Sequence, residues 1–461
     1  MQKALLERIK GKFKRIFVPY TLRRYNSIYK STQRHIRETE RMSPKEIEQY
    51  HLRKLKDLIR YCRLNSPYYR RLFKSISFCE DDLKSIDDYR RIPVLTKKEL
   101  KDNLDELSVQ GTLREKASYG TTGGTTGEPV GYYSYKTKLQ DIENAFVDDI
   151  WKRGGYSPGC QMAVMRGARI NKAAKDGYFW RKYAGIPRLF LSTFHLDEPN
   201  ANRYSELMSR YNVKYLHCFP SSALTFYKLL DKADAVKPKI DGILTSSEVL
   251  SDYNRKYIEK SADAPVLDLY GSSERVAIAG ECPECGLYHV YPQYGYVELT
   301  DEHGTHIDSP GGVGSIIGTS YVRCATPLLR YELGDMAVFA DSPGLCDRQY
   351  FSLERILGRQ VEYVYSDEGR EISMSLMNIH SDIFDSLIRF QFVQKKQGYV
   401  EFHYLPSVAM SIEEVTRIRR SIQNKLGKGF EVEMVSESYI PRGTNGKHRL
   451  LIQELKEFPA Q

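Results

Sequence analysis

Hydrophobic residues recur at helical spacing in the first part of the chain, after two helix-start signals. Ser43–Glu46 and Thr96–Glu99 both have the pattern of a capping box, in which a hydroxyl and a glutamate satisfy the first backbone N–H groups of a helix. After the first box, apolar residues follow three or four positions apart until Asn65. The pattern predicts one long helix, and then a short helix that runs toward Leu107.

From residue 131 to residue 250, short apolar runs alternate with helical patterns. The runs predict strands at residues 162–165, 188–191, 213–218, 240–245 and 264–268. The helical patterns cover residues 139–151, 205–211 and 251–262, and a further helix begins at Pro220. Alternation of this kind is typical of an α/β domain with a largely parallel sheet.

The pattern changes twice in the second half. Alternating apolar residues among many glycines predict an antiparallel β subdomain between residues 290 and 339. After Gly358-Arg359, a hairpin around Gly398, a helix capped by Ser411 and a strand at 430–435 predict a small α+β domain. We therefore expect an α/β protein with an N-terminal extension at residues 1–42, a large domain at 43–358 and a small mobile domain at 359–461.

Composition indicates an ordinary soluble protein and adds one hint about its ligands. The 461 residues are 41% hydrophobic and contain no apolar run that could span a bilayer and no signal-peptide pattern, so we expect a cytoplasmic enzyme. The net charge of +10 favours anionic ligands. Residues 1–24 combine basic residues with an apolar stripe, which fits either a helix packed on the body or peripheral contact with an anionic membrane. No nucleic-acid-binding module is recognisable.

The stretch Gly120–Pro129, Gly-Thr-Thr-Gly-Gly-Thr-Thr-Gly-Glu-Pro, suits neither a helix nor a strand. Glycines let backbone N–H groups turn toward an anion, and threonine hydroxyls add donors, so we predict a phosphate-binding loop. The stretch lacks the Gly-Lys-Ser/Thr of a Walker loop and does not follow a strand as G-x-G-x-x-G. Taken alone, it is equally a surface loop.

Four further stretches carry groups suited to a nucleotide. They are Tyr270–Glu274 after a predicted strand, Arg330–Asp335, Gly358–Gln360 at the expected domain boundary, and Pro441–Lys447 on a glycine-rich loop. Aromatic rings can flank a base, carboxylates can hold Mg²⁺ or ribose hydroxyls, and a lysine on a loop can be delivered to a site and withdrawn. Each stretch taken singly is also an ordinary turn, linker or surface group.

In this order and at these separations, the five stretches resemble the AMP-forming acyl/aryl ligase (adenylate-forming) superfamily. Within it, the chain resembles the phenylacetate–CoA ligase branch, and specifically its members associated with capsular polysaccharide synthesis. The resemblance runs from about Ser43 to the end. The segments Asn65–Arg70, Ile92–Lys97, Pro220–Ser222 and Thr245–Glu248 also fit this branch.

The resemblance implies a role for each motif residue. Lys447 would stabilise charge on the α-phosphate of ATP, Ser273 would contact that phosphate, and Glu274 would bind Mg²⁺. The other implied nucleotide contacts are Thr122, Gly123, Gly124, Thr125, Thr126 and Gly127 at the β- and γ-phosphates, Ser247 and Glu248 beside adenine, Tyr270 with Gly271 against its ring, Asp335 at the ribose, and Arg359 at the phosphates as the small domain moves.

The implied activity is ATP-dependent activation of a carboxylic acid as an acyl-adenylate, followed by rotation of the small domain and transfer of the acyl group. Coenzyme A is the expected acceptor, and an amine or a carrier-protein thiol is the alternative. Val361 removes the hinge carboxylate that the family usually has.

An accessory, non-catalytic nucleotide-binding component of a polysaccharide assembly system is the other class of function, and the joint presence of Glu274, Asp335 and Lys447 favours the enzyme. A homodimer is left open.

A separate pattern lies at Cys282, Cys285 and His289. Cys-x₂-Cys with a histidine four residues later suits a tetrahedral Zn²⁺ site. Relatives often carry a cysteine pair shortly before Gly-Arg, and by this resemblance Cys346 is the expected fourth ligand, with Cys324 as the alternative. Four protein ligands leave no position for water, so we expect a structural metal rather than a catalytic one.

Overall fold

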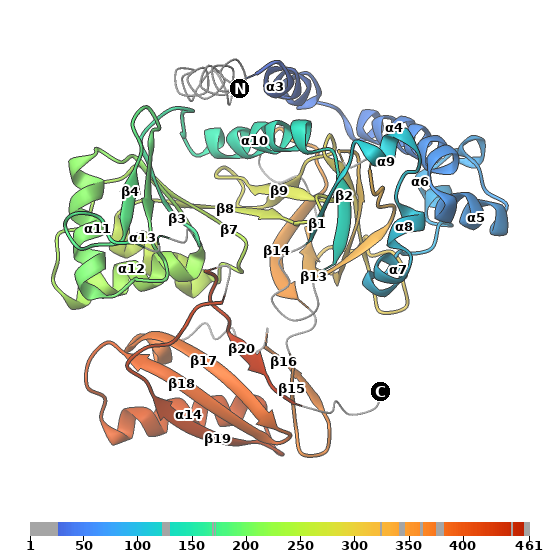
Figure 1. Ribbon diagram of the computed structural model, residues 1–461. Coiled ribbons are helices and arrows are strands. Elements are labelled where there is room, and N and C mark those ends of the chain that lie inside the picture. Colours follow the sequence, from blue (N-terminus) through green and yellow to red (C-terminus); the bar gives the residue numbers. More distant parts are fainter. Residues whose placement is uncertain are drawn as a thin grey trace, which may run out of the picture.

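The computed structural model describes residues 26–121, 130–167, 170, 172–322, 325–340, 346–359, 363–374, 382–443 and 446–455 (Figure 1). Helices dominate its first part: α3 (Ser27–Thr39), α4 (Pro44–Asn65), α5 (Pro67–Ser75), the short 3-10 helix η1 (Glu80–Asp82), α6 (Ile86–Tyr89), α7 (Lys97–Asp102), α8 (Leu104–Leu107) and α9 (Thr112–Glu115). Both predicted capping boxes are present, at Ser43 and at Thr96. The helix expected toward Leu107 is interrupted at Asn103, whose backbone leaves the helical conformation.

The predicted parallel strands form the middle of a 12-stranded sheet. Strands β5 (Arg188–Leu191), β3 (Met162–Met165), β6 (Tyr215–Cys218), β7 (Gly242–Ser246) and β8 (Val266–Gly271) lie side by side in that order and run parallel. The helices that alternate with them are α10 (Lys136–Arg153), α11 (Glu198–Arg210), α12 (Pro220–Lys232) and α13 (Asp252–Ala262). Helix α11 begins earlier than predicted because Asp197 caps it, accepting a hydrogen bond from the N–H of Asn200.

The antiparallel strands continue the same sheet rather than forming a separate one. They are β9 (Ile278–Glu281), β10 (Tyr288–Val290), β11 (Gly295–Thr300), β12 (Val313–Ser320), β13 (Tyr331–Phe339) and β14 (Ser352–Arg359), with β4 (Trp180–Lys182) at the opposite edge. Strand β8 joins the two parts, because it pairs in parallel with β7 and antiparallel with β9. The separate hairpin of β1 (Ser118–Thr121) and β2 (Gly131–Ser134) includes Gly120 and Thr121, so the first two residues of the predicted phosphate loop lie in a strand, contrary to the prediction. Residues 122–129 lie outside the described part.

A second, smaller sheet has the order β19-β18-β17-β20. Its elements are β17 (Leu387–Lys396), β18 (Tyr399–Pro406), α14 (Ile412–Leu426), β19 (Glu431–Ser436) and β20 (Leu451–Gln453), preceded by the hairpin β15 (Tyr363–Tyr365) and β16 (Glu371–Ser373) and the short helix η3 (Asp382–Phe384). It has its own apolar core, which includes Phe392, Phe402 and Ile418. In Figure 1 it lies below the large sheet, with β17 and β20 nearer to that sheet than α14. The fold class is therefore as predicted, whereas the domain limits at residues 42 and 358 stay a prediction.

None of the helices in the described part of the chain combines the length and the apolar character that crossing a bilayer requires.

Candidate active site

The predicted nucleotide-binding residues of the large sheet lie at the carboxyl ends of its parallel strands. Ser247 and Glu248 follow β7 directly. Tyr270 and Gly271 are the last two residues of β8, rather than residues after a strand as the sequence indicates. Ligands of α/β proteins bind at this edge, because successive parallel strands deliver their following loops to one place.

These residues border one cavity with residues of the smaller sheet. The cavity has a volume of about 360 Å³. Of the predicted site residues, its lining includes Ser247, Glu248, Tyr270, Gly271, Ser273, Glu274, Asp335 and Lys447. The loop residues Thr122–Gly127 lie outside the described part. Arg359 ends β14 and pairs along the backbone with Asp335. The structure therefore brings together eight predicted residues from both sheets.

The aromatic ring and the carboxylate predicted for adenosine are in direct contact. The hydroxyl of Tyr270 donates to Oδ2 of Asp335 over 2.9 Å, which joins the end of β8 to β13. Glu274 lies in the turn after β8 and is buried, whereas Ser273 beside it is exposed. A buried carboxylate on a cavity wall is a chemically suitable ligand for a hard cation such as Mg²⁺.

Lys447 is held at the cavity by a cluster of contacts that sequence reasoning missed. One carboxylate oxygen of Glu248 accepts from the backbone N–H of His448 at 2.9 Å, and the other accepts from the backbone N–H of Ser221 at 3.0 Å. Arg442 donates to the hydroxyl of Ser221 at 3.1 Å. Glu248 is predicted to lie beside adenine, but in the structure its carboxylate binds the loop that carries Lys447, which we call the lysine loop. We call Glu248, Ser221 and Arg442 the loop clamp.

Three buried basic side chains, Lys228, Arg389 and Arg442, lie at or beside the cavity. Arg389 and Arg442 are buried, and burial lowers the pKa of both, that of Arg389 to about 9. Burial also lowers the pKa of Lys228 to about 8 and that of His448 to about 3. Desolvated cations are stabilised by an anionic ligand, so this electrostatic environment suits a phosphate-bearing substrate.

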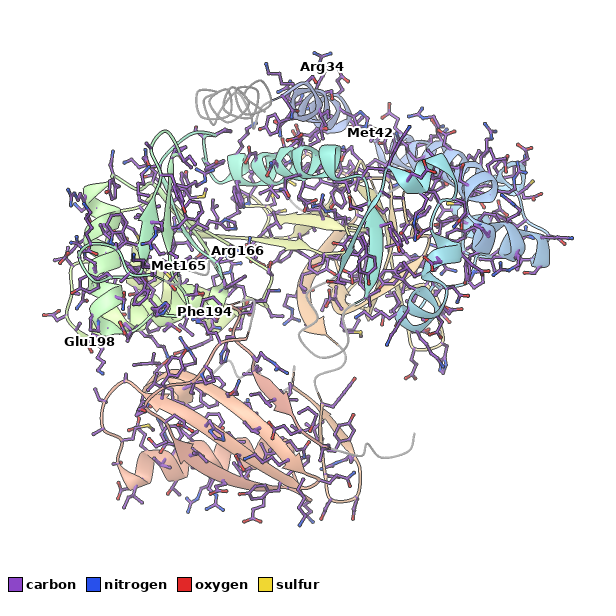
Figure 2. The ribbon with its side chains drawn as sticks, in the orientation of Figure 1. Arg34, Met42, Met165, Arg166, Phe194 and Glu198 are labelled. Carbon is purple, nitrogen blue, oxygen red and sulfur yellow. The ribbon has the colours of Figure 1, made fainter. Side chains whose placement is uncertain are left out.

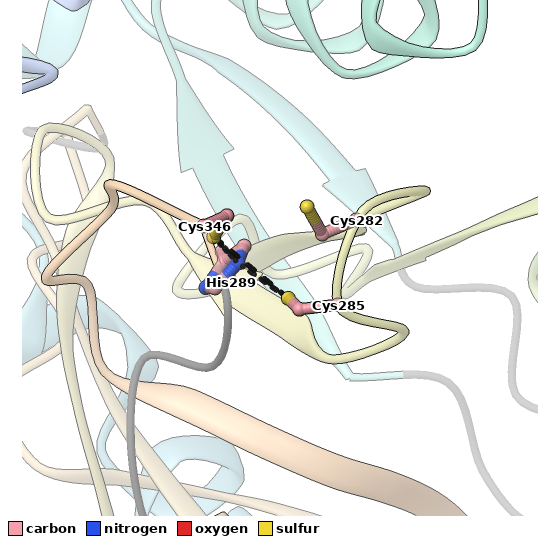
Figure 3. Close-up of side chains that lie close together, drawn as sticks. All are labelled: Cys282, Cys285, His289 and Cys346. Carbon is pink, nitrogen blue, oxygen red and sulfur yellow. Dashed lines mark hydrogen bonds between the residues drawn. The ribbon is translucent and has the colours of Figure 1, made fainter.

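The predicted cysteine and histidine ligands also come together, on β10 and the loops around it (Figure 3). The ligand atoms of Cys282, Cys285, His289 and Cys346 all lie within 4.8 Å of one another. Nε2 of His289 is 3.3 Å from Sγ of Cys285 and 3.1 Å from Sγ of Cys346. The other ring nitrogen, Nδ1, contacts the hydroxyl of Ser352 at 2.9 Å, which orients the ring toward the sulfurs.

The donor set fits zinc chemically. Three thiols and one imidazole are the ligands of structural Zn²⁺ sites, and Cys346 stands where the resemblance predicts it. The alternative ligand, Cys324, lies outside the described residues. Burial raises the pKa of the Cys285 thiol to about 12 and lowers the pKa of His289 to about 4. Without a cation, both groups are therefore neutral at physiological pH.

Known proteins match both the chain and its fold. Residues 364–454 match the CapK C-terminal domain family. The chain is 23% identical to Protein CapK of Staphylococcus aureus, with 98% of this chain and 97% of that protein covered. It is 24% identical to the phenylacetate-coenzyme A ligase of Escherichia coli (strain K12), with 87% of this chain and 94% of that protein covered.

Crystal structures of 2-hydroxyisobutyryl-CoA ligase share the fold. The structure of its postadenylation state with 2-HIB-AMP has a TM-score of 0.70 at 18% identity, covering 90% of this chain and 91% of that chain. The structure of its thioesterification state with 2-HIB-AMP and CoA has a TM-score of 0.55 at 17% identity, covering 91% and 92%. Together with the sequence matches, these likenesses confirm the predicted resemblance. The chain is a homologue of Protein CapK and of the phenylacetate-coenzyme A ligases, with the fold of the adenylate-forming ligases and a CapK C-terminal domain.

Proposed function

We propose that the protein activates a carboxylic acid with ATP and transfers the acyl group to coenzyme A. One observation carries the proposal: Tyr270 and Glu274 from one segment, and Asp335 and Lys447 from two distant ones, line one cavity. A carboxylate, a ribose-binding acid, an aromatic ring and a lysine are the groups that adenylation needs. An accessory protein that only binds nucleotide has no chemical need for the lysine.

In the first step, a carboxylate oxygen of the acid attacks the α-phosphorus of ATP. The bond from that phosphorus to the bridging oxygen breaks, and pyrophosphate leaves with the negative charge. Lys447 stabilises the charge that builds on the α-phosphate oxygens. Glu274 would hold Mg²⁺, which neutralises phosphate charge when it is bound. In the second step, the thiolate of coenzyme A attacks the acyl carbon and AMP leaves.

The arrangement of the two sheets supports a conformation suited to the first step. Lys447 lines the cavity together with Glu274. The likeness to the postadenylation structure, at a TM-score of 0.70, also exceeds the likeness to the thioesterification structure, at 0.55. The acceptor alternatives, an amine or a carrier-protein thiol, differ only in the nucleophile of the second step.

The test of this function is ATP–pyrophosphate exchange with a panel of carboxylic acids. We expect exchange with at least one acid, and we expect Lys447→Ala to lower it by about 10²-fold or more. Lys428→Ala is the matched control, because Lys428 is an exposed lysine between two glycines in the same part of the chain. Nucleotide binding without exchange for any acid would instead favour the accessory protein.

We also propose that the product serves the biosynthesis of capsular or other surface polysaccharide. Similarity to Protein CapK over nearly the whole chain supports this role. Deletion of the gene in a capsulated host should lower the amount of cell-surface polysaccharide. An unchanged amount would contradict the role. The cytoplasmic location, the homodimer and the membrane contact of residues 1–24 stay predictions, and residues 1–25 lie outside the described part.

We propose that Cys282, Cys285, His289 and Cys346 hold one structural Zn²⁺. Purified protein should contain about one zinc per chain, and Cys285→Ser should lose the metal and unfold at a lower temperature. Cys160→Ser is the control, since Cys160 is a half-buried free thiol away from the cluster. Zinc-free protein with unchanged thermal stability in chelator would contradict the site.

A further inference from the structure

Arg166 is a half-buried arginine that follows β3 at the same edge of the sheet as the cavity (Figure 2). Its Nη2 donates to the hydroxyl of Ser247 at 2.6 Å, and Ser247 lines the cavity. Its Nη1 contacts Nε2 of His217 at 2.9 Å. A guanidinium can only donate, so Nε2 of His217 must accept and that imidazole is neutral. Arg166 therefore lies directly beside the cavity wall, held by two neutral groups.

No ion pair neutralises Arg166 among the described residues. The two carboxylates that influence it are engaged elsewhere: Glu248 accepts from Ser221 and His448, and Asp268 accepts from Thr245 and Tyr288. Nε of Arg166 is also buried and has no hydrogen-bond partner within the described part of the chain. A cation that is partly removed from water and has no counter-ion is unfavourable unless a ligand supplies the anion.

The positions of Arg166 and Lys447 indicate which kind of ligand could supply that anion. The guanidinium carbon of Arg166 lies 5.1 Å from the centre of the Phe219 ring, and Nζ of Lys447 lies 6.0 Å from the same centre. Both cations therefore lie close to the same aromatic ring. A small molecule whose reacting carboxylate lies by Lys447 can place a second anionic group by Arg166.

We propose that Arg166 binds a second anionic group of the acid, so that the preferred substrate is a dicarboxylic acid or an acid with another anion in an equivalent place. This inference rests on the proposed function, and it names the substrate class of the same site. A guanidinium forms two parallel hydrogen bonds with a carboxylate, and Arg166 can offer this geometry by releasing Ser247. The neutral His217 and the Phe219 ring leave the charge of Arg166 for the ligand.

The test compares acids that differ only in the second carboxylate. Pyrophosphate exchange is measured with glutarate against valerate, adipate against hexanoate, and 4-carboxyphenylacetate against phenylacetate. We expect at least one dicarboxylate to exceed its partner in kcat/KM by about 10²-fold, because a poorly solvated charge disfavours a ligand that leaves it unpaired. Arg166→Gln should remove most of that preference and leave the activity with the monocarboxylate within a few-fold.

Arg188→Gln is the matched control for folding. Arg188 is a buried arginine at the opposite, amino end of β5, where it contacts the hydroxyl of Tyr156 and two backbone carbonyls. It should leave the dicarboxylate preference unchanged. A preference for monocarboxylates in the wild type, or an equal loss for both members of each pair in Arg166→Gln, would overturn the inference while leaving the proposed function intact.

A binding measurement distinguishes failure of the proposed function from failure of the anion subsite at Arg166. If no acid supports exchange, the proposed function fails, and titration calorimetry with glutarate, adipate and 4-carboxyphenylacetate in the presence of AMP still tests Arg166. Saturable binding of one of these dianions that is lost in Arg166→Gln supports the anion subsite. Binding that is absent, or that is equal in the wild type and Arg166→Gln, overturns it.

Discussion

At the scale of single residues, the lysine loop depends on a glycine that no other residue can replace. Gly446 has a φ of +79°. A Cβ at this position would lie 2.3 Å from Cα of Gly167 and 2.9 Å from Oγ1 of Thr193. Both the backbone conformation and the close approach of two backbones therefore exclude a side chain.

We predict that Gly446→Ala displaces Lys447 from the cavity and lowers pyrophosphate exchange by about 10²-fold or more, as loss of a lysine that stabilises the transition state would. Gly304→Ala is the matched control, because Gly304 has the same φ of +79° with open space around its Cβ position. Gly304→Ala therefore has the same unfavourable backbone conformation but no steric clash at its Cβ. Equal exchange rates for the two variants would show that the contact with Gly167 does not position the loop.

The sequence predicts the identity of the site residues better than their contacts. Tyr270, Glu274, Asp335 and Lys447 belong to motifs, and the structure brings them to one cavity. The clamp between Glu248 and the backbone of His448 depends on how two sheets meet, and no local pattern encodes that geometry. A signal existed, since Ser221, Glu248 and Arg442 all lie in or beside the quoted motifs. These positions alone do not indicate that the three residues contact one another, because the contacts form only when the two sheets meet.

At the scale of elements, helix α12 is pinned to the small sheet by a buried lysine. Nζ of Lys228 donates to the backbone carbonyls of Phe384, Asp385 and Leu387, between η3 and the start of β17. Burial is the main cause that lowers the pKa of Lys228 to about 8. The docked arrangement therefore binds this proton less tightly than an arrangement in which Lys228 faces water.

The sign of the pH dependence follows from that difference. Below pH 8 the lysine is charged in both arrangements, and the docked one bears the full cost of burying the charge. Between pH 8 and about 10.5, the docked amine is neutral while the exposed one is still charged, so a rise in pH favours docking. We predict that the radius of gyration of the wild type, measured by small-angle X-ray scattering, falls across this range.

Lys228→Met should remove the pH dependence and give a more open arrangement at pH 7, because three carbonyls lose their donor. Lys232→Met is the control on the same helix, since Lys232 is partly exposed and pairs with Glu198 within the large domain. A radius of gyration that rises with pH in the wild type, or a pH dependence that survives in Lys228→Met, would contradict this view of the contact.

At the scale of the whole molecule, the order of elements was predictable and their assembly into one sheet was not. Strands at residues 162–165 and 188–191 match the prediction to the residue, and the long helix ends at Asn65, in the region predicted. Periodicity reports local conformation, whereas strand pairing depends on contacts between distant segments. The sequence therefore indicates parallel and antiparallel regions but not that β8 joins them through β9.

The contacts between the two sheets imply that the two half-reactions respond differently to the same substitution. Lys447, Gly446 and the loop clamp act in the arrangement described here, in which the lysine lines the cavity. Transfer of the acyl group to coenzyme A requires no charge stabilisation at the α-phosphate by Lys447 if the small domain has turned away. Gly446→Ala and Lys447→Ala should then slow adenylation and spare transfer.

We predict that both variants make thioester from preformed acyl-adenylate and coenzyme A at rates within about threefold of the wild type, while their pyrophosphate exchange falls by about 10²-fold. The acyl-adenylate is that of the acid with the fastest exchange, and single-turnover kinetics measures each half-reaction separately. Lys428→Ala should alter neither. A parallel loss of both half-reactions in Lys447→Ala would mean that Lys447 stays at the cavity throughout, so that the small domain does not turn between the two steps.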